Sequence, residues 1–272
     1  MRAVEYQVMS EVEDSHWWYE AQRSAMESVL KKVGLLESLK GCSVLDAGCG
    51  TGGHLKWLQS LLNSTKLAGF DRSHEAICRA RKKVPDAQIW TDDLTQCSLT
   101  LHDKCYDLIL CSDVIYSLDQ ATVFTALETL LKPLRSGGLF LLHVPALPWL
   151  YSHHDLSVGT RHRYRRREID ELLTKLGLEL ILVSYRMSIL LPLVLLQRLP
   201  SIIRLQLQRC RGASGKMASL AAESADTPSQ LRLPGTWLNG LLKTVMRGES
   251  WWLSRGGTFP VGCSILALGR KP

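Results

Sequence analysis

The chain has 272 residues, of which 46% are hydrophobic and 22% charged, and its net charge is +7. This composition is too apolar for a disordered chain, and the length is enough to bury a substantial core. Glu11, Glu13 and Asp14 near the N-terminus, without a long apolar core, argue against a signal peptide. The eight cysteines form no C-x-x-C pair, so we expect no metal site and a reducing, cytoplasmic setting.

The positive charge is confined to the C-terminal part. Residues 1–160 hold 15 basic and 19 acidic side chains, a net charge of −4, whereas residues 161–272 hold 18 basic and 7 acidic, a net charge of +11. Five arginines lie between residues 161 and 167. They fit a solvated helix face, an anionic substrate or a membrane surface. The chain lacks a recognisable RNA-binding module, so we expect no nucleic acid partner.

From residue 24 to about 145, helical stretches alternate with short apolar runs, which is typical of a parallel α/β sheet. We expect buried strands at 43–45, 67–70, 107–111 and 139–144. We expect helices at 24–36, 54–62, 74–83 and 121–131. A helix at 167–176, an apolar run at 178–183 and a β-rich segment at 261–268 follow.

The segment between the last two runs differs in character, and we expect residues 186–258 to form a cap inserted between two strands. Residues 187–203 are highly apolar, but the uncharged part is too short for a transmembrane helix. Residues 201–209 predict a surface helix, packed against the body or a bilayer, and 237–246 a further helix. Residues 211–230 are rich in Ala, Ser and Gly and predict a flexible loop.

The strongest signal is a strand that runs into Asp46 and then into glycines at positions 48, 50, 52 and 53. Glycines allow a tight turn and close approach of a ligand, and the next helix offers free N–H groups. The spacing Gly48-x-Gly50-x-x-Gly53 also satisfies the dinucleotide fingerprint. The glycines alone therefore leave the ligand open.

Three carboxylates narrow this choice. Asp46 precedes the glycines, where it would repel a pyrophosphate but could orient waters or a cationic amino acid. Asp71 ends the next apolar run, where it can accept both ribose hydroxyls. Asp93 follows a third run and could accept from an adenine amino group. A nicotinamide enzyme is the less favoured alternative, because Asp46 suits it poorly.

Together these residues resemble class I S-adenosylmethionine-dependent methyltransferases. The resemblance extends to His16-Trp17-Trp18-Tyr19 with Arg23, which is similar to an N-terminal H-x-W-[WFY]-x-x-x-R lid of one bacterial group. It also covers the stretch from His143 to Tyr164 and the C-terminal residues 262–272, and so nearly the whole chain.

The resemblance implies a Rossmann-like, doubly wound sheet of seven strands, in the order 3-2-1-4-5-7-6 with the last strand antiparallel. We expect one methyltransferase domain over residues 1–272, with lid helices at 1–40, a core at 41–185 and 259–272, and the cap at 186–258. Ligands should lie at the carboxyl ends of the strands. The expected S-adenosylmethionine contacts are Asp46, Gly48, Cys49, Gly50, Gly52, Asp71, Arg72, Asp93, Leu94, Ser112 and Tyr19.

One departure from the family concerns the proton acceptor. Many relatives have an acid–histidine pair after strand 4, where this chain has Tyr116 and Ser117. We therefore expect another base: His154 beside Asp155 first, then His143, then Tyr116. A histidine near a strand end can equally be structural, and a neutral amine or ring-carbon nucleophile needs no strong base.

The expected activity is methyl transfer from S-adenosylmethionine to oxygen or nitrogen of a small-molecule acceptor. One alternative is a lipid or lipid-linked sugar, methylated at a membrane that the cap contacts peripherally. A non-catalytic S-adenosylmethionine-binding protein is a second alternative.

Overall fold

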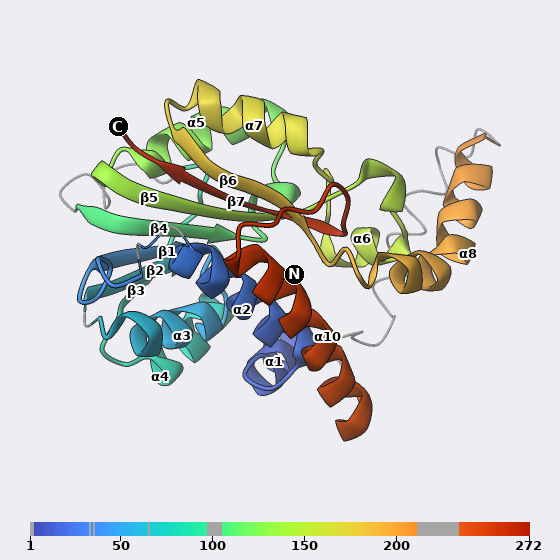
Figure 1. Cartoon of the computed structure of the whole chain (residues 1–272), viewed down its shortest axis with the longest axis horizontal. Helices are drawn as coiled ribbons and strands as arrows, with labels where there is room; N and C mark the ends of the chain where they lie inside the picture. The colour runs from blue at the N-terminus through green and yellow to red at the C-terminus, as the bar shows by residue number, and fades with distance from the viewer. Residues whose placement is uncertain (1–2, 33, 35, 65, 97–104, 211–233) are drawn as a thin grey trace.

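Seven strands form one sheet in the order β3-β2-β1-β4-β5-β7-β6 (Figure 1). The computed structural model describes residues 3–32, 34, 36–64, 66–96, 105–210 and 234–272. All neighbouring strands from β3 to β5 pair in parallel, whereas β7 is antiparallel to both β5 and β6. The expected fold class and strand order are confirmed.

The strands are β1 (Ser43–Ala47), β2 (Lys66–Asp71), β3 (Gln88–Thr91), β4 (Tyr106–Ser112), β5 (Leu134–Pro145), β6 (Glu179–Arg186) and β7 (Ser264–Arg270). The α-helices are α1 (Ala3–Val12), α2 (Trp17–Lys32), α3 (Gly53–Leu62), α4 (His74–Lys83), α5 (Gln120–Leu131), α6 (His153–Val158), α7 (Arg166–Lys175), α8 (Leu191–Cys210) and α10 (Thr236–Ser254). Two short 3-10 helices span Ile115–Ser117 and Pro148–Leu150.

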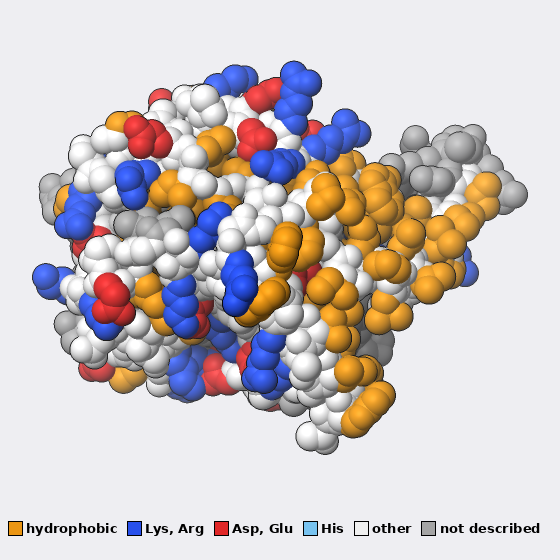
Figure 2. Space-filling view, viewed as in Figure 1, with side chains coloured by type: hydrophobic (Ala, Val, Ile, Leu, Met, Phe, Trp, Pro, Cys, Tyr) orange, Lys and Arg blue, Asp and Glu red, His pale blue; other side chains and the backbone are white. Residues whose placement is uncertain are grey.

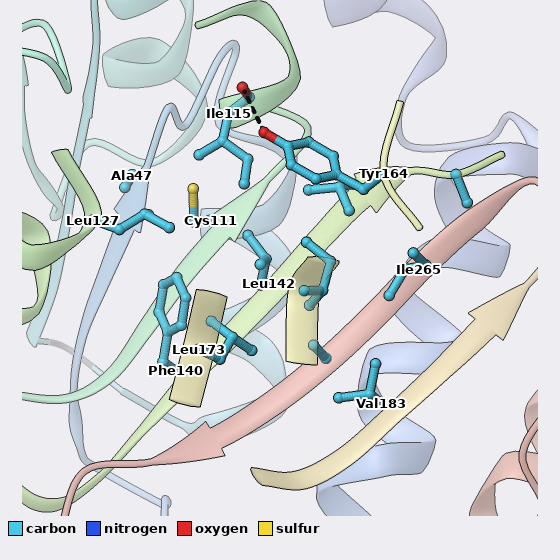
Figure 3. Packing of buried hydrophobic residues seen from close by; sticks show 14 of the residues in the cluster. Ala47, Cys111, Ile115, Leu127, Phe140, Leu142, Tyr164, Leu173, Val183 and Ile265 are labelled. Atoms are coloured by element: carbon cyan, nitrogen blue, oxygen red, sulfur yellow. Dashed lines mark hydrogen bonds between the residues drawn. The ribbon is translucent and has the colours of Figure 1, made fainter. Parts of the chain in front are cut away.

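Side chains alternate between the two faces of each strand, so the sheet buries a hydrophobic layer on both sides. Leu45 of β1 belongs to the layer under α5 and α7, and its neighbour Val44 to the layer under α2, α3 and α4. Figure 3 shows Phe140 and Leu142 of β5 in the first layer, near Leu173 of α7. These two layers fix the helices and so hold the strand ends in place.

The carboxyl ends of the parallel strands lie level with one another. Ala47 of β1 is aligned with Phe70 of β2 and with Cys111 of β4. Ser112 at the end of β4 is aligned with His143 of β5. The candidate residues that end four different strands therefore meet at one edge of the sheet.

Two helices differ from the expected ranges, each for a local reason. The helix expected at 24–36 begins at Trp17, because Nδ1 of His16 accepts from the N–H of Trp18 and caps the helix start. It ends at Lys32, followed by Gly34 with φ of 66°. The helix expected at 237–246 continues to Ser254, so Trp251 and Trp252 lie inside α10.

The connection between β6 and β7 carries α8 and α10. The apolar run expected at 187–203 and the surface helix expected at 201–209 are joined from Leu191 onward in one helix, α8, with Pro200 inside it. The expected flexible loop at 211–230 lies outside the described residues. Among the described helices, none has the length and apolar character needed to cross a membrane.

The insertion and the N-terminal helices pack on each other. Asn239 of α10 accepts from the N–H of Trp17 (2.9 Å) and donates to the carbonyl of Ser15 (3.0 Å). Lys243 of α10 forms an ion pair of 2.5 Å with Glu20 of α2. Helix α10 therefore fixes the position of the N-terminal helices over the strand ends.

Candidate active site

The turn between β1 and α3 requires glycine. Gly48, Gly50 and Gly52 have φ of 77°, 53° and 89°, in the left-handed region that other residues rarely adopt. A Cβ on Gly48 would lie 2.3 Å from a methyl group of Val114. The N–H of Gly48 donates to the carbonyl of Phe70 at 2.8 Å, which fastens the turn to β2.

Asp71 connects the end of β2 to this turn. Its Oδ2 accepts from the N–H of Gly50 (3.1 Å) and its Oδ1 from the N–H of Ser73 (2.8 Å). Burial raises the pKa of Asp71, and these two hydrogen bonds oppose that effect. The carboxylate lines the cavity at the place where the sequence predicts ribose binding.

Asp46 lies behind the turn and is 1% exposed. Among the described residues, no group forms a hydrogen bond with its Oδ2. Burial raises the pKa of Asp46 to about 8, and the charges of Asp71 and Glu13 add to the effect. A buried carboxyl group of this kind gains from any cation or hydrogen-bond donor that reaches it.

A cavity of about 1000 Å³ opens at these strand ends. This volume is at the upper end of small-molecule sites, so it can accommodate a nucleoside cofactor and a small acceptor. Most of the predicted site residues line it: Tyr19, Gly48, Cys49, Gly50, Asp71, Arg72, Asp93, Leu94, Ser112, Tyr116, His143 and His154. Asp46 and Gly52 are not among the lining residues.

Asp93, predicted to bind adenine, also holds its own loop. Its Oδ1 accepts from the N–H and the hydroxyl of Thr95, at 2.8 and 2.7 Å. A hydrogen bond from an aspartate side chain to the backbone two residues further along the chain closes a local turn. This turn fixes the Asp93 carboxylate at the cavity wall.

A polar cluster joins α2 to the ends of β4 and β5. Nε2 of Gln22 lies 2.7 Å from Oδ2 of Asp113 and 2.9 Å from Oγ of Ser112. Nδ1 of His143 lies 3.0 Å from the same Asp113 oxygen. Burial alone would raise the pKa of Asp113, but the charge of His143 and the hydrogen bonds from His143 and Gln22 lower it overall.

The other ring nitrogen of His143 faces β6. Nη1 of Arg186 lies 3.4 Å from Nε2 of His143, and both side chains are buried. Burial lowers the pKa of Arg186, and the charges of Glu249 and Asp113 oppose that effect. Both ring nitrogens of His143 therefore have protein partners.

The carboxylate expected beside His154 has other partners. Asp155 accepts from the N–H of Ser152 (3.0 Å), which closes a capping box at the start of α6. It also accepts from Arg163 (2.7 Å) and Arg198 (3.3 Å). Asp155 thus fixes α6 and α8 in place, and His154 lines the cavity on the first turn of α6.

Burial also determines the protonation state of Tyr116 and Tyr19, whose phenol groups line the cavity. It raises the pKa of Tyr116, and the charge of Asp113 adds to that effect. It raises the pKa of Tyr19 as well, with a contribution from Glu13. Both hydroxyl groups are therefore neutral near pH 7 and can donate a hydrogen bond.

Glu13, Gln22 and His54 are among the lining residues that were not predicted from the sequence. Glu13 accepts from Oγ1 of Thr51 (2.6 Å) and pairs with Lys83, so the α1–α2 connection contacts the glycine turn. Burial, with the charge of Arg23, lowers the pKa of His54 to about 4. The position of His54, directly after the glycines, is the one sequence signal for it.

The wall opposite the glycine turn is basic. Arg163, Arg198 and Arg204 line the cavity there, and the last two lie on α8. Glu13 and Asp71 line the end near the glycines. The cavity therefore has an acidic end at the sheet and a basic end at the insertion.

Comparisons with known proteins identify the family and the fold of this chain. Residues 17–183 match a family model described as a methyltransferase domain. Nodulation protein S of Azorhizobium caulinodans is 31% identical over 103 residues, which cover 38% of this chain and 48% of that protein. The chain therefore matches about half the length of this curated relative.

Two solved structures share the fold over nearly the whole chain. A putative methyltransferase of Haloferax volcanii, in complex with the Trm112 methyltransferase activator, has a TM-score of 0.57 at 18% identity, covering 99% of this chain and 94% of that one. An S-adenosylmethionine-dependent methyltransferase of Mesorhizobium loti has a TM-score of 0.56 at 14% identity, covering 95% and 100%. Because the family model covers more than half of its length, the chain belongs to the methyltransferase domain family, and it shares its fold with an S-adenosylmethionine-dependent methyltransferase.

Proposed function

We propose that this enzyme transfers the methyl group of S-adenosylmethionine to an oxygen or nitrogen atom of a small molecule bound in the 1000 Å³ cavity. The observation that carries the proposal is the continuity of this cavity. It runs from the glycine turn and Asp71 to the histidines and arginines of α6 and α8. One cavity can therefore hold a methyl donor and an acceptor side by side.

The residues present at the glycine turn fit the cofactor. A Cβ at Gly48 would fill the turn, Asp71 can accept from ribose hydroxyls, and the buried Oδ2 of Asp46, which has no partner among the described residues, suits a nearby cationic group. When bound, the cofactor supplies an activated methyl group on a sulfonium. The protein then has to align the acceptor and exclude water. Helices α1 and α2 line the cavity, and the hydrogen bonds of Asn239 to Trp17 and of Gln22 to Ser112 hold α2 against the strand ends for that purpose.

His154 is the side chain that we propose takes the proton from a hydroxyl acceptor. It lines the cavity and is half-buried, which leaves it accessible to an acceptor. His143 is less suited, because Asp113 and Arg186 occupy its two nitrogens. The neutral phenol of Tyr116 is suited to donate a hydrogen bond that positions the acceptor.

A lipid or lipid-linked sugar is the second candidate acceptor. Its support is that α8, which lines the cavity through Val194, Gln197 and Arg198, also carries exposed leucines. The six described cysteines that are free thiols fit a reducing compartment, so we propose that the enzyme acts in the cytoplasm or on a membrane that faces it.

A panel of acceptors tests the proposal. The enzyme is incubated with methyl-labelled S-adenosylmethionine and with phenols, carboxylic acids, amines or dispersed lipids, and S-adenosylhomocysteine is quantified. Label on oxygen or nitrogen of one acceptor class is expected. Label on carbon or sulfur of the product would contradict the proposal. The His162→Gln variant, whose histidine lies outside the cavity and pairs with Glu168, should turn over at the wild-type rate.

A further inference from the structure

Helices α8 and α10 expose large apolar side chains to solvent. Figure 2 shows hydrophobic side chains gathered over both helices on one face of the molecule. Leu196 of α8 is 71% exposed and Trp237 of α10 is 78% exposed. The other exposed members are Leu193, Leu199, Ile203, Leu207, Leu238, Leu241, Trp251 and Trp252. We call these ten residues the apolar face.

The apolar face is distinct from the side of the helices that packs on the core. In α8, Leu193, Leu196, Leu199, Ile203 and Leu207 recur every three or four residues, so they form one stripe along the helix. Ile202 and Leu205 of the same helix are buried against the body. An apolar stripe that the core does not use is typical of a surface that binds a partner.

The exposed charged side chains of α8 and α10 have one sign. Within the described residues of α8 and α10, Glu249 is the one acidic side chain, and it is buried. Its carboxylate accepts from the N–H of Met187 (2.7 Å) and Ser188 (2.8 Å), so it adds no exposed negative charge. Arg204, Arg247 and Arg255 are exposed. The guanidinium of Arg255 lies 4.4 Å from the ring of Trp251.

This combination matches an anionic bilayer in particular. Leucines can enter the acyl boundary, tryptophans favour the interface, and arginines attract acidic head groups. A second copy of the chain would bring these arginines against the same positive charges. A membrane-spanning role is not needed, because a helix lying in the interface plane buries such a stripe.

We propose that the apolar face of α8 and α10 docks on an anionic lipid bilayer. Docking would bring the basic end of the cavity to the head-group layer, because Arg198 and Arg204 of α8 line that end. This placement of the cavity matters only if the proposed function is correct. In that case it favours an amphiphilic acceptor with a negatively charged group. The docking itself does not depend on methyl transfer.

Vesicle flotation tests the docking. The full-length protein is mixed with vesicles of phosphatidylcholine alone or of phosphatidylcholine with phosphatidylglycerol, and the floated fraction is measured at low and high salt. We expect flotation with the anionic vesicles, weakened by salt. Leu196→Glu and Trp237→Glu should each reduce the floated fraction at least about tenfold, because they place a carboxylate on the apolar face. Phe124→Glu is the matched control, because it changes an exposed aromatic residue on α5, and it should float like the wild type.

Two further measurements distinguish a loss of membrane docking from misfolding and from self-association. Titration with S-adenosylmethionine should give the same affinity for the wild type, Leu196→Glu and Trp237→Glu, which shows that the variants are folded. Light scattering after size-exclusion chromatography should give a monomer without lipid. A dimer that Leu196→Glu dissociates would assign the apolar face to a second copy and overturn the proposal. Wild-type protein that stays unfloated with anionic vesicles would overturn it as well, even if methyl transfer is detected.

Discussion

The Nη1 atom of Arg186 on β6 lies 3.4 Å from Nε2 of His143 on β5. A guanidinium can only donate hydrogen bonds, so Nε2 of His143 has to accept. The other ring nitrogen, Nδ1, lies 3.0 Å from Oδ2 of Asp113 on the β4 side and 2.8 Å from Nε2 of Gln22 on α2. This histidine therefore connects three elements at the carboxyl edge of the sheet.

Replacement of His143 should cost stability. In His143→Gln, Asp113 and Arg186 lose a buried partner, so we expect the free energy of unfolding to fall by about 2–3 kcal/mol. Urea denaturation followed by circular dichroism measures this change. His162→Gln removes a half-buried pair with Glu168, close to solvent, and should cost less than about 1 kcal/mol. Equal losses in the two variants would contradict the connecting role of His143.

His154→Gln should lower kcat for a hydroxyl acceptor by at least about 100-fold, because a positioned general base contributes that much. The affinity for S-adenosylmethionine should stay unchanged, since Asp71 and the glycine turn are intact. The pH–rate profile of the wild type should show an acidic limb that the variant lacks. A variant that keeps the acidic limb would exclude His154 as the base.

Asp71→Ala should weaken cofactor binding. Loss of hydrogen bonds from ribose hydroxyls to a charged acceptor costs about 2 kcal/mol, which corresponds to about 30-fold in Kd. Calorimetric titration with S-adenosylhomocysteine measures this change. Asp86→Ala, at an exposed aspartate outside the cavity, is the control and should bind like the wild type. Unchanged affinity in Asp71→Ala would refute the ribose assignment.

Asp46 should make the cofactor-free protein less stable as pH rises. Its pKa is about 8 in the folded chain and in the usual range near 4 when unfolded, so the folded state retains a proton that the unfolded state has lost. Between these values the carboxyl group lowers stability by up to about 1.4 kcal/mol per pH unit. Asp46→Asn should therefore gain stability relative to the wild type from about pH 5 to about pH 8. The measurement is the urea midpoint of the wild type and of Asp46→Asn as a function of pH. If the two midpoints change in parallel with pH, Asp46 has an ordinary pKa in the folded chain.

Asn239→Ala should loosen the N-terminal helices. The side chain bonds to Trp17 and Ser15, so its removal should lower the free energy of unfolding by about 1–2 kcal/mol. It should also raise the KM for S-adenosylmethionine, because α2 covers the cavity. Thr244→Ala removes a hydrogen bond within α10 and serves as the control on the same helix. If both variants lose the same stability and keep the same KM, α10 does not hold the N-terminal helices in place.

Those parts of the fold that depend on residues close together in the sequence could be predicted. Helix α4 begins and ends as predicted, because the hydroxyl of Ser73 accepts from the N–H of Ala76 and caps the helix start. The glycine turn is a contiguous strand–turn–helix signal, so the position of this turn at the carboxyl ends of the strands could be predicted from the sequence.

The acceptor end depends on contacts between distant parts of the chain. Gln22 meets Asp113 across 91 residues, and Arg186 meets His143 across 43. No spacing in the sequence indicates such pairs, because the packing of α2 and β6 against the strand ends creates them. The adjacency of His154 and Asp155 in the sequence predicts that the carboxylate assists the histidine. In the helix, however, the Asp155 carboxylate is needed for the capping box and for two arginines.

A crystal structure with S-adenosylhomocysteine would test the central claim most directly. We predict ribose hydroxyls within hydrogen-bond distance of Asp71 and a sulfur atom that faces the space between His154 and Arg198. A ribose placed away from Asp71, or a sulfur that faces away from α6 and α8, would contradict the account.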